Sequence, residues 1–350
     1  MAYTVNEKIQ NLEPYQPIQG SCRIRLDANE SFLQPQAELL AELGREAASV
    51  AFNRYPDPYA ETLCRAFADF YHIDPADVVA GNGSDELISL LFSAFLMKGE
   101  TVMTLSPDFS MYRFYGGISE AQCLEYRKNS DFSMDVDALA HSVQKNKVRM
   151  LIFSNPCNPT SIGLKREEIR RLVRAVDALV VLDEAYMDFW DQSLLGEERA
   201  FDNLIILRTC SKAAGMAALR VGFAVACPKL VRCLKAVKSP YNVNAVSQKI
   251  GAAVLSRTER LSFCRKQIIA SRDALFMGLQ QLEAEHPGKI HVYSTVTNFV
   301  TVAIPDSAAA YEKLLRAGIA VRCFDGFLRV TAGSLQENDE FLKTFAEILI

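Results

Sequence analysis

The chain of 350 residues is 49% hydrophobic and 23% charged, an ordinary globular composition that excludes a disordered or collagen-like protein. Its 38 basic and 42 acidic residues give a net charge of −4, which does not suggest a nucleic-acid or anionic-membrane partner. The sequence has no apolar run of the roughly 18 residues that a membrane-spanning helix needs, and no secretory signal at its start. Nine scattered cysteines without a C-x-x-C pair, and only four histidines, predict a cytoplasmic protein with reduced thiols and no metal site.

The length favours two domains, at about 150 residues each. We expect residues 1–34 to form an N-terminal arm that packs with the smaller domain, because prolines interrupt this segment. Residues 35–243 are expected to form a large α/β domain, which begins with helical spacing near 35–50 and 60–72. Residues 244–350 are expected to form an interdomain helix and a small α+β domain.

Short apolar segments of strand type alternate with helical segments between about residues 78 and 226. Continuous apolar strands separated by helices are typical of a parallel sheet that helices cover on both faces. Ligands on such sheets bind beyond the carboxyl ends of the strands. The expected strands are Thr101–Leu105, Met150–Ser154, Leu179–Asp183, Leu204–Arg208 and Val221–Ala226, and the expected helices are Leu87–Leu96 and Arg166–Val176.

The pattern changes after Pro240, where helical spacing covers about residues 244–284. Shorter segments with mixed strand and helix patterns follow, which is typical of an α+β domain. The expected elements are strands at 291–293 and 299–303, a helix near 308–316, a strand pair around 320–330 and a final amphipathic helix.

A glycine-rich turn stands between an expected strand and an expected helix. Gly81 and Gly83 have the spacing that begins a dinucleotide-binding fingerprint, but Glu86 occupies the place of the third glycine, which argues against a Rossmann cofactor. The free N–H groups of Ser84 and Asp85 at the helix N-terminus suit one phosphate. A tight turn with Ser84 as the N-cap is the alternative.

Two polar side chains directly follow expected strands of the sheet. Asn158 lies between two prolines after the strand that ends at Ser154, and its amide either donates to a ligand or forms a structural Asx turn. Asp183 ends a strand of four apolar residues, and Tyr186 follows three residues later. An ionised aspartate at the end of a buried strand needs a cationic partner, unless it is a surface residue or an N-cap.

Lys212 follows another expected strand and lies among small, weakly polar residues. Such surroundings favour the neutral amine that Schiff-base chemistry requires, whereas most lysines are solvated surface charges. Thr209, Ser211 and Arg220 add two hydroxyl groups and a guanidinium group that suit a phosphate.

The order of these features resembles fold-type I pyridoxal-phosphate enzymes, and specifically the class I and II aminotransferases. The resemblance narrows to the histidinol-phosphate aminotransferase family over about residues 12–349, although threonine-phosphate decarboxylases and aromatic amino acid aminotransferases share much of the pattern. It implies an α/β fold, in which a large domain with a mostly parallel seven-stranded sheet, covered by helices, joins a smaller α+β domain. The segments that carry the resemblance are Pro14–Pro17, Leu26–Glu30, Asn53–Pro58, Gly83–Glu86, Ser239–Asn244 and Phe327–Ser334.

The resemblance assigns a role to each candidate residue. Lys212 would hold pyridoxal phosphate covalently and act as the base and acid of the proton shift, and Asp183 would pair with the pyridinium nitrogen. Tyr186 and Asn158 would bond to the phenolic oxygen of the cofactor. Phe109 would stack on its ring, with an ordinary core position as the alternative. The other implied cofactor contacts are the backbone of Ser84 and Asp85, the side chains of Thr209, Ser211 and Arg220, and Tyr55 from the other subunit of a homodimer.

The resemblance implies L-histidinol phosphate, or a similar amino donor, and 2-oxoglutarate as substrates. Arg329 would bind the substrate carboxylate by a bidentate pair. Arg322 is a candidate for the substrate's phosphate or second acid, with an exposed strand arginine as the alternative. Tyr15 and Asn29 would line the substrate pocket from the N-terminal arm. A cofactor-binding regulator without turnover is a further alternative, but the sequence has no appended DNA-binding module.

The sequence departs from the family pattern in the loop that contains Asn158. The family usually continues Thr-Gly, whereas here Thr160 is followed by Ser161, Ile162 and Gly163. The sequence leaves open how this departure changes the turn.

Overall fold

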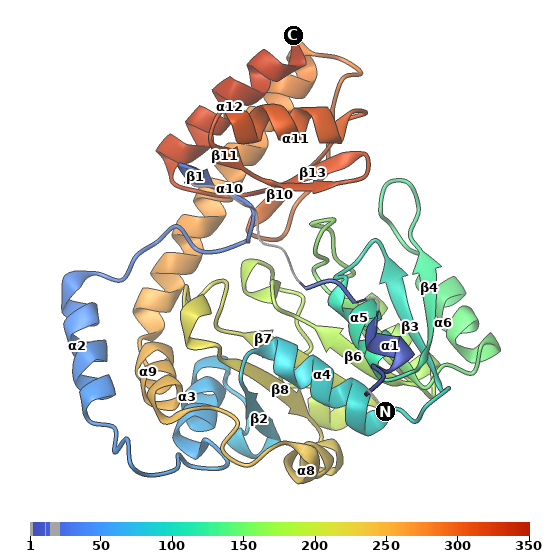
Figure 1. Cartoon of the computed structure of the whole chain (residues 1–350), viewed down its shortest axis with the longest axis vertical. Coiled ribbons are helices and arrows are strands. Elements are labelled where there is room, and N and C mark those ends of the chain that lie inside the picture. Colours follow the sequence, from blue (N-terminus) through green and yellow to red (C-terminus); the bar gives the residue numbers. More distant parts are fainter. Residues whose placement is uncertain (1–2, 11, 15–21) are drawn as a thin grey trace.

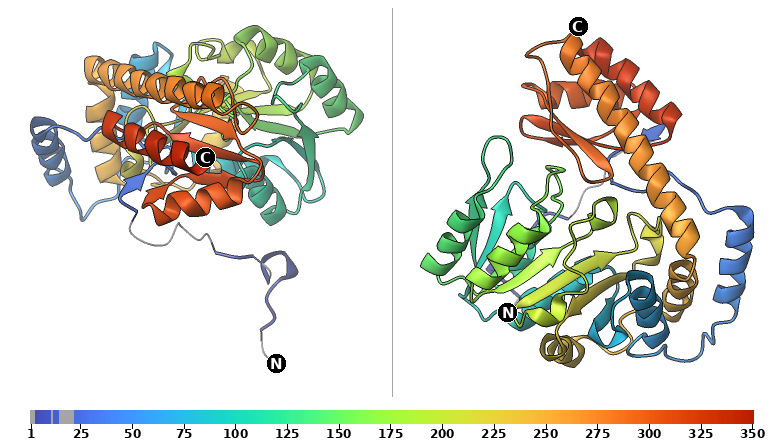
Figure 2. Two further views of the ribbon diagram at one scale, coloured as in Figure 1. Left: turned by 90° about the horizontal axis from the view of Figure 1, so that it is seen from above. Right: turned by 180° about the vertical axis from the view of Figure 1, so that it is seen from behind.

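We describe the protein from a computed structural model, in which residues 3–10, 12–14 and 22–350 are described. The chain forms a large α/β domain and a smaller α+β domain above it (Figure 1). The long helix α10 (Thr258–Glu285) begins beside the large domain and ends within the small one, as Figure 2 shows from behind. Tyr15, an expected substrate contact, lies outside the described residues.

A seven-stranded sheet forms the centre of the large domain, in the order β2-β8-β7-β6-β5-β3-β4. Six strands run in one direction and β8 runs against them, which confirms the predicted mostly parallel sheet. The central strands are fully buried, because helices cover both faces. The strands are β2 (Val78–Gly81), β3 (Thr101–Ser106), β4 (Gln122–Arg127), β5 (Met150–Ser154), β6 (Leu179–Asp183), β7 (Leu204–Thr209) and β8 (Gly222–Ala226).

Two apolar clusters bury the two faces of this sheet. Side chains of α4, α5 and α8 form one cluster with the strands, and side chains of α2, α3, α6, α7 and α9 form the other. The helices are α2 (Ala37–Ala48), α3 (Glu61–Tyr71), α4 (Ser84–Phe95), α5 (Met111–Ile118), α6 (Val136–Lys145), α7 (Arg166–Ala175), α8 (Pro228–Val237) and α9 (Ala245–Leu255), with short 3₁₀ turns η1 (Pro75–Asp77), η2 (Met187–Phe189), η3 (Glu198–Ala200) and η4 (Ala217–Leu219).

The small domain contains a four-stranded antiparallel sheet in the order β12-β13-β10-β9. Its apolar core also takes residues of α10, α11 and α12. A capping box at Ser334 begins α12, because its hydroxyl accepts the N–H of Glu337. The elements are β9 (His291–Val292), β10 (Phe299–Ala303), α11 (Ser307–Arg316), β11 (Ile319–Ala320), β12 (Arg322–Phe324), β13 (Phe327–Thr331) and α12 (Leu335–Leu349).

One expected element differs in the structure, and one observed strand was not expected. The helix expected at 244–284 is two helices, because the chain leaves helical hydrogen bonding at Ser256 and Arg257 between α9 and α10. The edge strand β4 has no counterpart among the expected strands, because its mostly exposed, polar sequence lacks the apolar run of a buried strand.

The N-terminal arm contacts both domains. Its strand β1 (Ile24–Arg25) pairs in parallel with β11 of the small domain. Its first helix, α1 (Glu7–Gln10), lies against α5 of the large domain, where Lys8 Nζ donates to Ile118 O at 3.1 Å. The described parts of the arm therefore contact the small domain through β1 and the large domain through α1.

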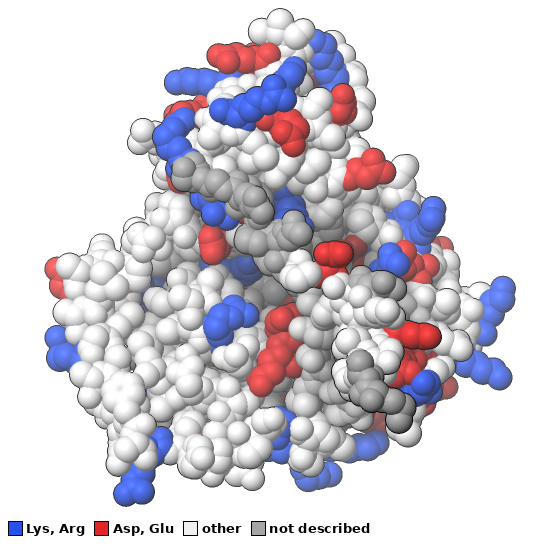
Figure 3. All heavy atoms as spheres, in the orientation of Figure 1, with Lys and Arg blue, Asp and Glu red and all other residues white. Residues whose placement is uncertain are grey.

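Surface charges of both signs are interspersed on the face shown in Figure 3, and several gather around the hollow between the two domains. No helix of the described chain is both long and apolar enough to cross a membrane. The described residues also contain no group of three or more His, Cys, Asp or Glu side chains that could hold a metal ion.

Candidate active site

Loops from six neighbouring strands meet at one edge of the large sheet, below the small domain. Because six strands are parallel, their carboxyl ends lie at the same edge, and the start of the antiparallel β8 joins them. The register pairs Ser154 with Asp183 and Thr209 with Gly222. The predicted residues at this edge are Ser84 and Asp85 after β2, Phe109 after β3, Asn158 after β5, Asp183 and Tyr186 at β6, Thr209, Ser211 and Lys212 at β7, and Arg220 before β8.

Asp183 is a buried carboxylate at the end of β6, with 4% of its surface exposed. Tyr112 Oη donates to its Oδ2 at 2.8 Å, and the backbone N–H of Ala185 donates to its Oδ1 at 3.1 Å. Burial raises the pKa of Asp183 to about 6, although the bond from Tyr112 acts in the opposite direction. Both donors are neutral, so a cationic group at this carboxylate would stabilise its ionised form.

The Lys212 amine lies in the same region, with its Nζ 5.8 Å from the centre of the Tyr186 ring. It donates to the backbone oxygen of Ala28 at 3.0 Å. Burial, and after it the positive charge of Arg329, lower the pKa of Lys212 to about 8. A substantial fraction of the amine is therefore neutral near physiological pH, which nucleophilic attack on a carbonyl requires.

Gly83, Gly222 and Arg220 form a tight cradle at the N-terminus of α4. A Cβ atom at Gly83, which has a φ of +85°, would lie 2.7 Å from Arg220 Nη2. A Cβ atom at Gly222 would lie 2.2 Å from the backbone nitrogen of Ser84. Only glycine at both positions lets the guanidinium and the helix N-terminus approach one another, and together they suit a phosphate.

Two hydroxyl groups lie beside this cradle. Thr209 Oγ1 is 3.0 Å from Ser211 Oγ and accepts the backbone N–H of Ser211 at 3.1 Å. The side chain of Asp85 takes no part in the cradle, since its Oδ2 accepts from Tyr115 Oη at 3.0 Å. The expected contribution of the Asp85 backbone N–H to a phosphate stays a prediction.

Arg329 links the small domain to the loop after β5. It is 7% exposed, and it donates hydrogen bonds to Asn158 Oδ1 and to the backbone oxygen of Asp27. Its guanidinium carbon also lies 5.4 Å from the centre of the Phe299 ring. Because Asn158 uses its Oδ1 for Arg329, its amide nitrogen remains the group that can donate to a ligand.

Tyr186 and Asn29 contact each other beneath the small domain. Asn29 is 1% exposed, and its Nδ2 donates to Tyr186 Oη at 2.8 Å. The Tyr186 ring packs edge-on against Phe299, with 5.2 Å between ring centres. The structure therefore places the Asn29 amide in contact with the Tyr186 hydroxyl. That Asn29 also lines the substrate pocket stays a prediction.

Tyr112 is a site residue that sequence reasoning missed. It is fully buried on α5, bonds to Asp183, and packs edge-on against Phe109 with 5.5 Å between ring centres. Its position near the start of α5, three residues after Phe109 in the loop that follows β3, is the only signal that the sequence offers.

Arg322 lies directly opposite Arg329 in the β12–β13 pair. Residues opposite each other in an antiparallel pair point to the same face, so Arg322 shares the face of Arg329. Thr301, opposite Arg329 on its other side, donates from Oγ1 to Pro159 O at 2.6 Å, which shows that this face meets the loop of Asn158. The role of Arg322 in binding substrate stays a prediction.

Tyr55 is not part of the buried site of its own chain. Its side chain is 81% exposed and stacks on Tyr241, with 4.6 Å between ring centres. An exposed tyrosine pair is available to a second copy of the chain, and its contribution across a dimer stays a prediction.

The departure from the family pattern begins at Ser161, in the loop that contains Asn158. Ser161 is buried with a φ of +64°, the left-handed conformation that glycine adopts most easily. Its Oγ lies 2.8 Å from the backbone oxygen of Ser294, and its own backbone oxygen accepts from Val296. The loop therefore docks onto the small domain through a residue that the family usually lacks.

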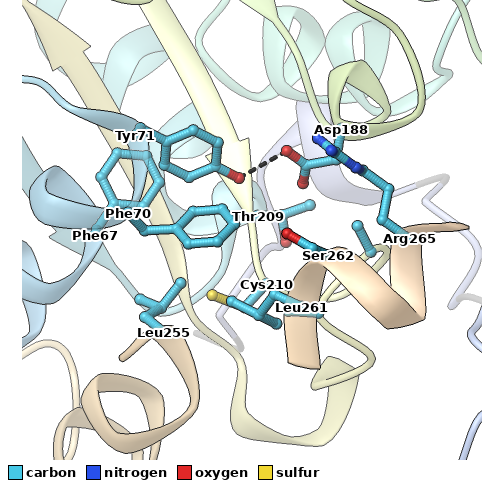
Figure 4. Close-up of a pocket in the computed structure, with 12 residues that line it drawn as sticks. Phe67, Phe70, Tyr71, Asp188, Thr209, Cys210, Leu255, Leu261, Ser262 and Arg265 are labelled. Atoms are coloured by element: carbon cyan, nitrogen blue, oxygen red, sulfur yellow. Dashed lines mark hydrogen bonds between the residues drawn. The ribbon is translucent and has the colours of Figure 1, made fainter. Parts of the chain in front are cut away.

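A separate cavity of about 30 Å³ lies behind the Lys212 segment, between α3 and the α9–α10 junction (Figure 4). Its wall is mainly apolar, and Tyr71 Oη donates to Asp188 Oδ1 at 2.7 Å on one side. This volume accommodates about one water molecule. The cavity is therefore too small to hold a substrate or a cofactor, and we place the candidate site on the other side of Lys212.

These residues fit pyridoxal phosphate on three structural grounds. The glycine cradle at Arg220 is shaped for one phosphate. Asp183 is a buried carboxylate whose charge would be stabilised by a protonated ring nitrogen. Lys212 has the lowered pKa that lets an amine attack an aldehyde.

A sequence model of the family described as aminotransferase class I and II matches residues 23–345. The histidinol-phosphate aminotransferase of Clostridium kluyveri is 38% identical to the chain over 348 residues, which cover 98% of each protein. Both comparisons extend over nearly the whole chain, including every described candidate residue.

Two solved structures have the same fold. Histidinol-phosphate aminotransferase from Sinorhizobium meliloti, in complex with pyridoxal-5'-phosphate, gives a TM-score of 0.87 at 21% identity and covers 99% of this chain and 98% of that one. L-threonine-O-3-phosphate decarboxylase from Porphyromonas gingivalis gives 0.77 at 20% identity and covers 93% of this chain and 99% of that one. One fold thus serves both transamination and decarboxylation, so fold alone does not select the reaction.

Proposed function

The chain belongs to the class I and II aminotransferases, and from this membership we propose that it transfers the amino group of L-histidinol phosphate to 2-oxoglutarate. It is an aminotransferase that depends on pyridoxal phosphate. The observation that carries the choice of amino donor is the 38% identity, over 98% of both chains, with a histidinol-phosphate aminotransferase.

Two arginines on one face support an anionic substrate. Arg322 and Arg329 lie opposite each other on neighbouring strands, so their side chains share one face of the sheet. L-histidinol phosphate carries a phosphate and no carboxylate, whereas 2-oxoglutarate carries two carboxylates. The two guanidinium groups would bind phosphate in one half-reaction and carboxylate in the other.

The side chains at the sheet edge would each have a separate role in the reaction. When bound, pyridoxal phosphate supplies an electron-poor ring that stabilises negative charge on the carbon that loses its proton. Lys212 would take that proton as a neutral amine and return it at the other end of the reacting unit. Asp183 would keep positive charge at the ring nitrogen, and Asn158 and Tyr186 would donate to the phenolic oxygen.

We also propose that the enzyme acts as a homodimer in the cytoplasm. The exposed stack of Tyr55 on Tyr241 supports a second copy at this surface, since large aromatic side chains at a surface commonly mark an interface. The absence of a C-x-x-C pair among nine cysteines fits a reducing compartment.

The amino donor is tested by steady-state turnover of L-histidinol phosphate, threonine phosphate and phenylalanine, each with and without 2-oxoglutarate. We expect L-histidinol phosphate to have the highest kcat/KM and to require 2-oxoglutarate. Release of carbon dioxide from threonine phosphate without a 2-oxo acid would instead identify a decarboxylase. A preference for phenylalanine would identify an aromatic amino acid aminotransferase.

A further inference from the structure

A closed hydrogen-bonded ring joins Asn29 to Thr331 at the end of β13. The backbone N–H of Asn29 donates to Thr331 Oγ1 at 3.0 Å, and Thr331 Oγ1 donates to Asn29 Oδ1, also at 3.0 Å. On its other side, Asn29 Nδ2 donates to Tyr186 Oη at 2.8 Å. The side chains of Asn29 and Thr331 are buried, with 1% and 2% of their surface exposed.

The structure assigns a direction to each of these hydrogen bonds. The hydroxyl of Thr331 accepts from the backbone N–H of Asn29 and donates its one hydrogen to Asn29 Oδ1. The carbonyl end of the amide therefore faces Thr331, and the NH₂ end faces Tyr186. An amide nitrogen donates and does not accept, so Tyr186 Oη is the acceptor of this bond.

The hydrogen of the Tyr186 hydroxyl is thereby left for a different partner. Burial raises the pKa of Tyr186, so the phenol retains this hydrogen at neutral pH. Lys212 lies 5.8 Å from the centre of the same ring, so the group that it holds lies close to the tyrosine. The phenolic oxygen of the cofactor is the acceptor that the proposed function gives to this hydrogen.

The backbone of Asn29 is also held in place. Asn29 has a φ of +53°, and asparagine is among the few side chains that adopt this conformation readily. Asn298 Nδ2 donates to the backbone oxygen of Asn29 at 3.0 Å. Thr331 lies two residues after Arg329 on β13, so a single strand of the small domain supports both Tyr186, through Asn29, and Asn158, through Arg329.

We propose that Asn29 is a positioning residue for the transamination: its bond to Tyr186 Oη directs the phenol hydrogen to the cofactor, and Thr331 holds Asn29 in the required orientation. This inference rests on the proposed roles of Tyr186 and Lys212. It does not depend on which amino donor the enzyme uses.

The test is a pH titration of the visible absorption of the cofactor-loaded protein, with no amino donor present. A hydrogen bond to the phenolic oxygen stabilises the deprotonated chromophore, so Tyr186→Phe should raise the midpoint by about one pH unit or more. Asn29→Ala should raise the midpoint by about half a unit, because the phenol hydrogen is no longer directed. In the Tyr186→Phe background, Asn29→Ala should add nothing, as expected for two residues that act in series.

Thr331 provides a second, milder pair of variants. Thr331→Val removes the hydroxyl that orients Asn29 while keeping the shape of the side chain, and it should raise the midpoint in the same direction as Asn29→Ala. Thr331→Ser retains the hydroxyl and should have the same midpoint as the parent protein. This pair keeps the proposal testable even if Asn29→Ala folds poorly.

Asn338 supplies a matched control in the same domain. It is 2% exposed, its Nδ2 donates to Ser271 Oγ at 2.8 Å, and its Oδ1 accepts from Gly333 at 2.9 Å. Asn338→Ala should lower the stability in the way that loss of any buried asparagine does, but it should leave the midpoint unchanged.

Three results would overturn the inference. They are an unchanged midpoint in Tyr186→Phe, equal midpoints in Asn29→Ala and Asn338→Ala, and an additive effect of Asn29→Ala in the Tyr186→Phe background. If the predicted midpoints are found but L-histidinol phosphate is not a substrate, the proposed amino donor is wrong and the role of Asn29 stands.

Discussion

Burial changes Lys212 and Asp183 in chemically complementary ways. Both side chains lie at the same sheet edge, and burial favours the neutral form of each. For the lysine this produces a nucleophile, with a pKa of about 8. For the aspartate, burial raises the pKa to about 6. A cationic partner would therefore stabilise the ionised form of this carboxyl group. The same low-polarity surroundings therefore favour a nucleophilic amine at Lys212 and a carboxylate that binds a cation at Asp183.

The rate at which cofactor-free protein takes up pyridoxal phosphate should rise with pH around a midpoint of about 8, because only the neutral Lys212 amine attacks the aldehyde. The rate is measured as the growth of the visible absorption band. Arg329→Ala removes a positive charge that lowers the pKa of Lys212, so its midpoint should be higher. A parent midpoint near the ordinary value of 10.5 would show that Lys212 is not the desolvated amine described here.

Asp183→Asn should stabilise the cofactor-free protein at neutral pH. The folded protein keeps the Asp183 proton up to about pH 6, whereas the unfolded chain releases it near 3.8. The folded state therefore binds more protons between these values, and the stability contribution of Asp183 falls as the pH rises through this range. Above pH 6 the variant should gain at most about 3 kcal/mol in the free energy of unfolding, and this gain should be much smaller at pH 4 and vanish well below pH 3.8.

Denaturant unfolding of parent and variant at pH 4 and pH 7.5 measures this difference. With cofactor bound, the same substitution should slow turnover, since Asp183 no longer holds charge at the ring nitrogen. Equal stability of the two proteins at pH 7.5 would show that burial does not penalise the Asp183 carboxylate.

The sequence predicts the strands of the large sheet better than it predicts the side-chain contacts at the sheet edge. The bounds of β5 and β6 agree with the sequence prediction, because each is a continuous apolar run that ends at a polar residue. The polar residues after these strands were predicted at the sheet edge for the same reason. The bond from Asn29 to Tyr186 was not predictable, because it joins residues 157 positions apart through a left-handed backbone and a third side chain. Tyr112 was missed because its role depends on how α5 packs against β6.

The loop after β5 gives a direct test of backbone strain at Ser161. Both Ser161→Gly and Ser161→Ala remove the hydroxyl near Ser294, but only alanine retains a Cβ atom in the left-handed conformation. Ser161→Gly should therefore be more stable than Ser161→Ala by about 0.5–1 kcal/mol in denaturant unfolding. Equal stability, or a more stable alanine variant, would mean that the left-handed turn imposes no strain on a side chain at this position.

Several polar contacts of the small domain involve residues of the candidate site. Thr301 and Arg329 of the small domain bond to Pro159 and Asn158 in the loop after β5, and Thr331 bonds to Asn29 of the N-terminal arm. The residues proposed to bind the substrate and the cofactor are thus held by adjacent strands of one small sheet. A shift of the small domain would move both sets together.

A mixed-subunit experiment tests whether Tyr55 serves the site of a partner chain. Dimers of Lys212→Ala and dimers of Tyr55→Ala should each have low activity. A mixed dimer contains one site with an intact Lys212 and, if Tyr55 acts across the interface, an intact Tyr55 from the other chain. Unfolding and refolding the two variants together should then restore about a quarter of the parent activity, because half of the dimers are mixed and each has one complete site.

Activity no higher than that of the Tyr55→Ala dimer would show that Tyr55 does not act across an interface. Sedimentation of the parent protein at the mass of a single chain, 39.0 kDa, would exclude the dimer itself.

The most direct test of the central claim is the visible absorption spectrum of the cofactor-loaded protein before and after addition of L-histidinol phosphate without a 2-oxo acid. The account predicts a yellow band that bleaches as the cofactor takes the amino group, and that returns when 2-oxoglutarate is added. Lys212→Ala should show no such band. A band in the parent protein that does not respond to L-histidinol phosphate would contradict the proposed donor, and a parent protein that forms no band with pyridoxal phosphate would contradict the assigned role of Lys212.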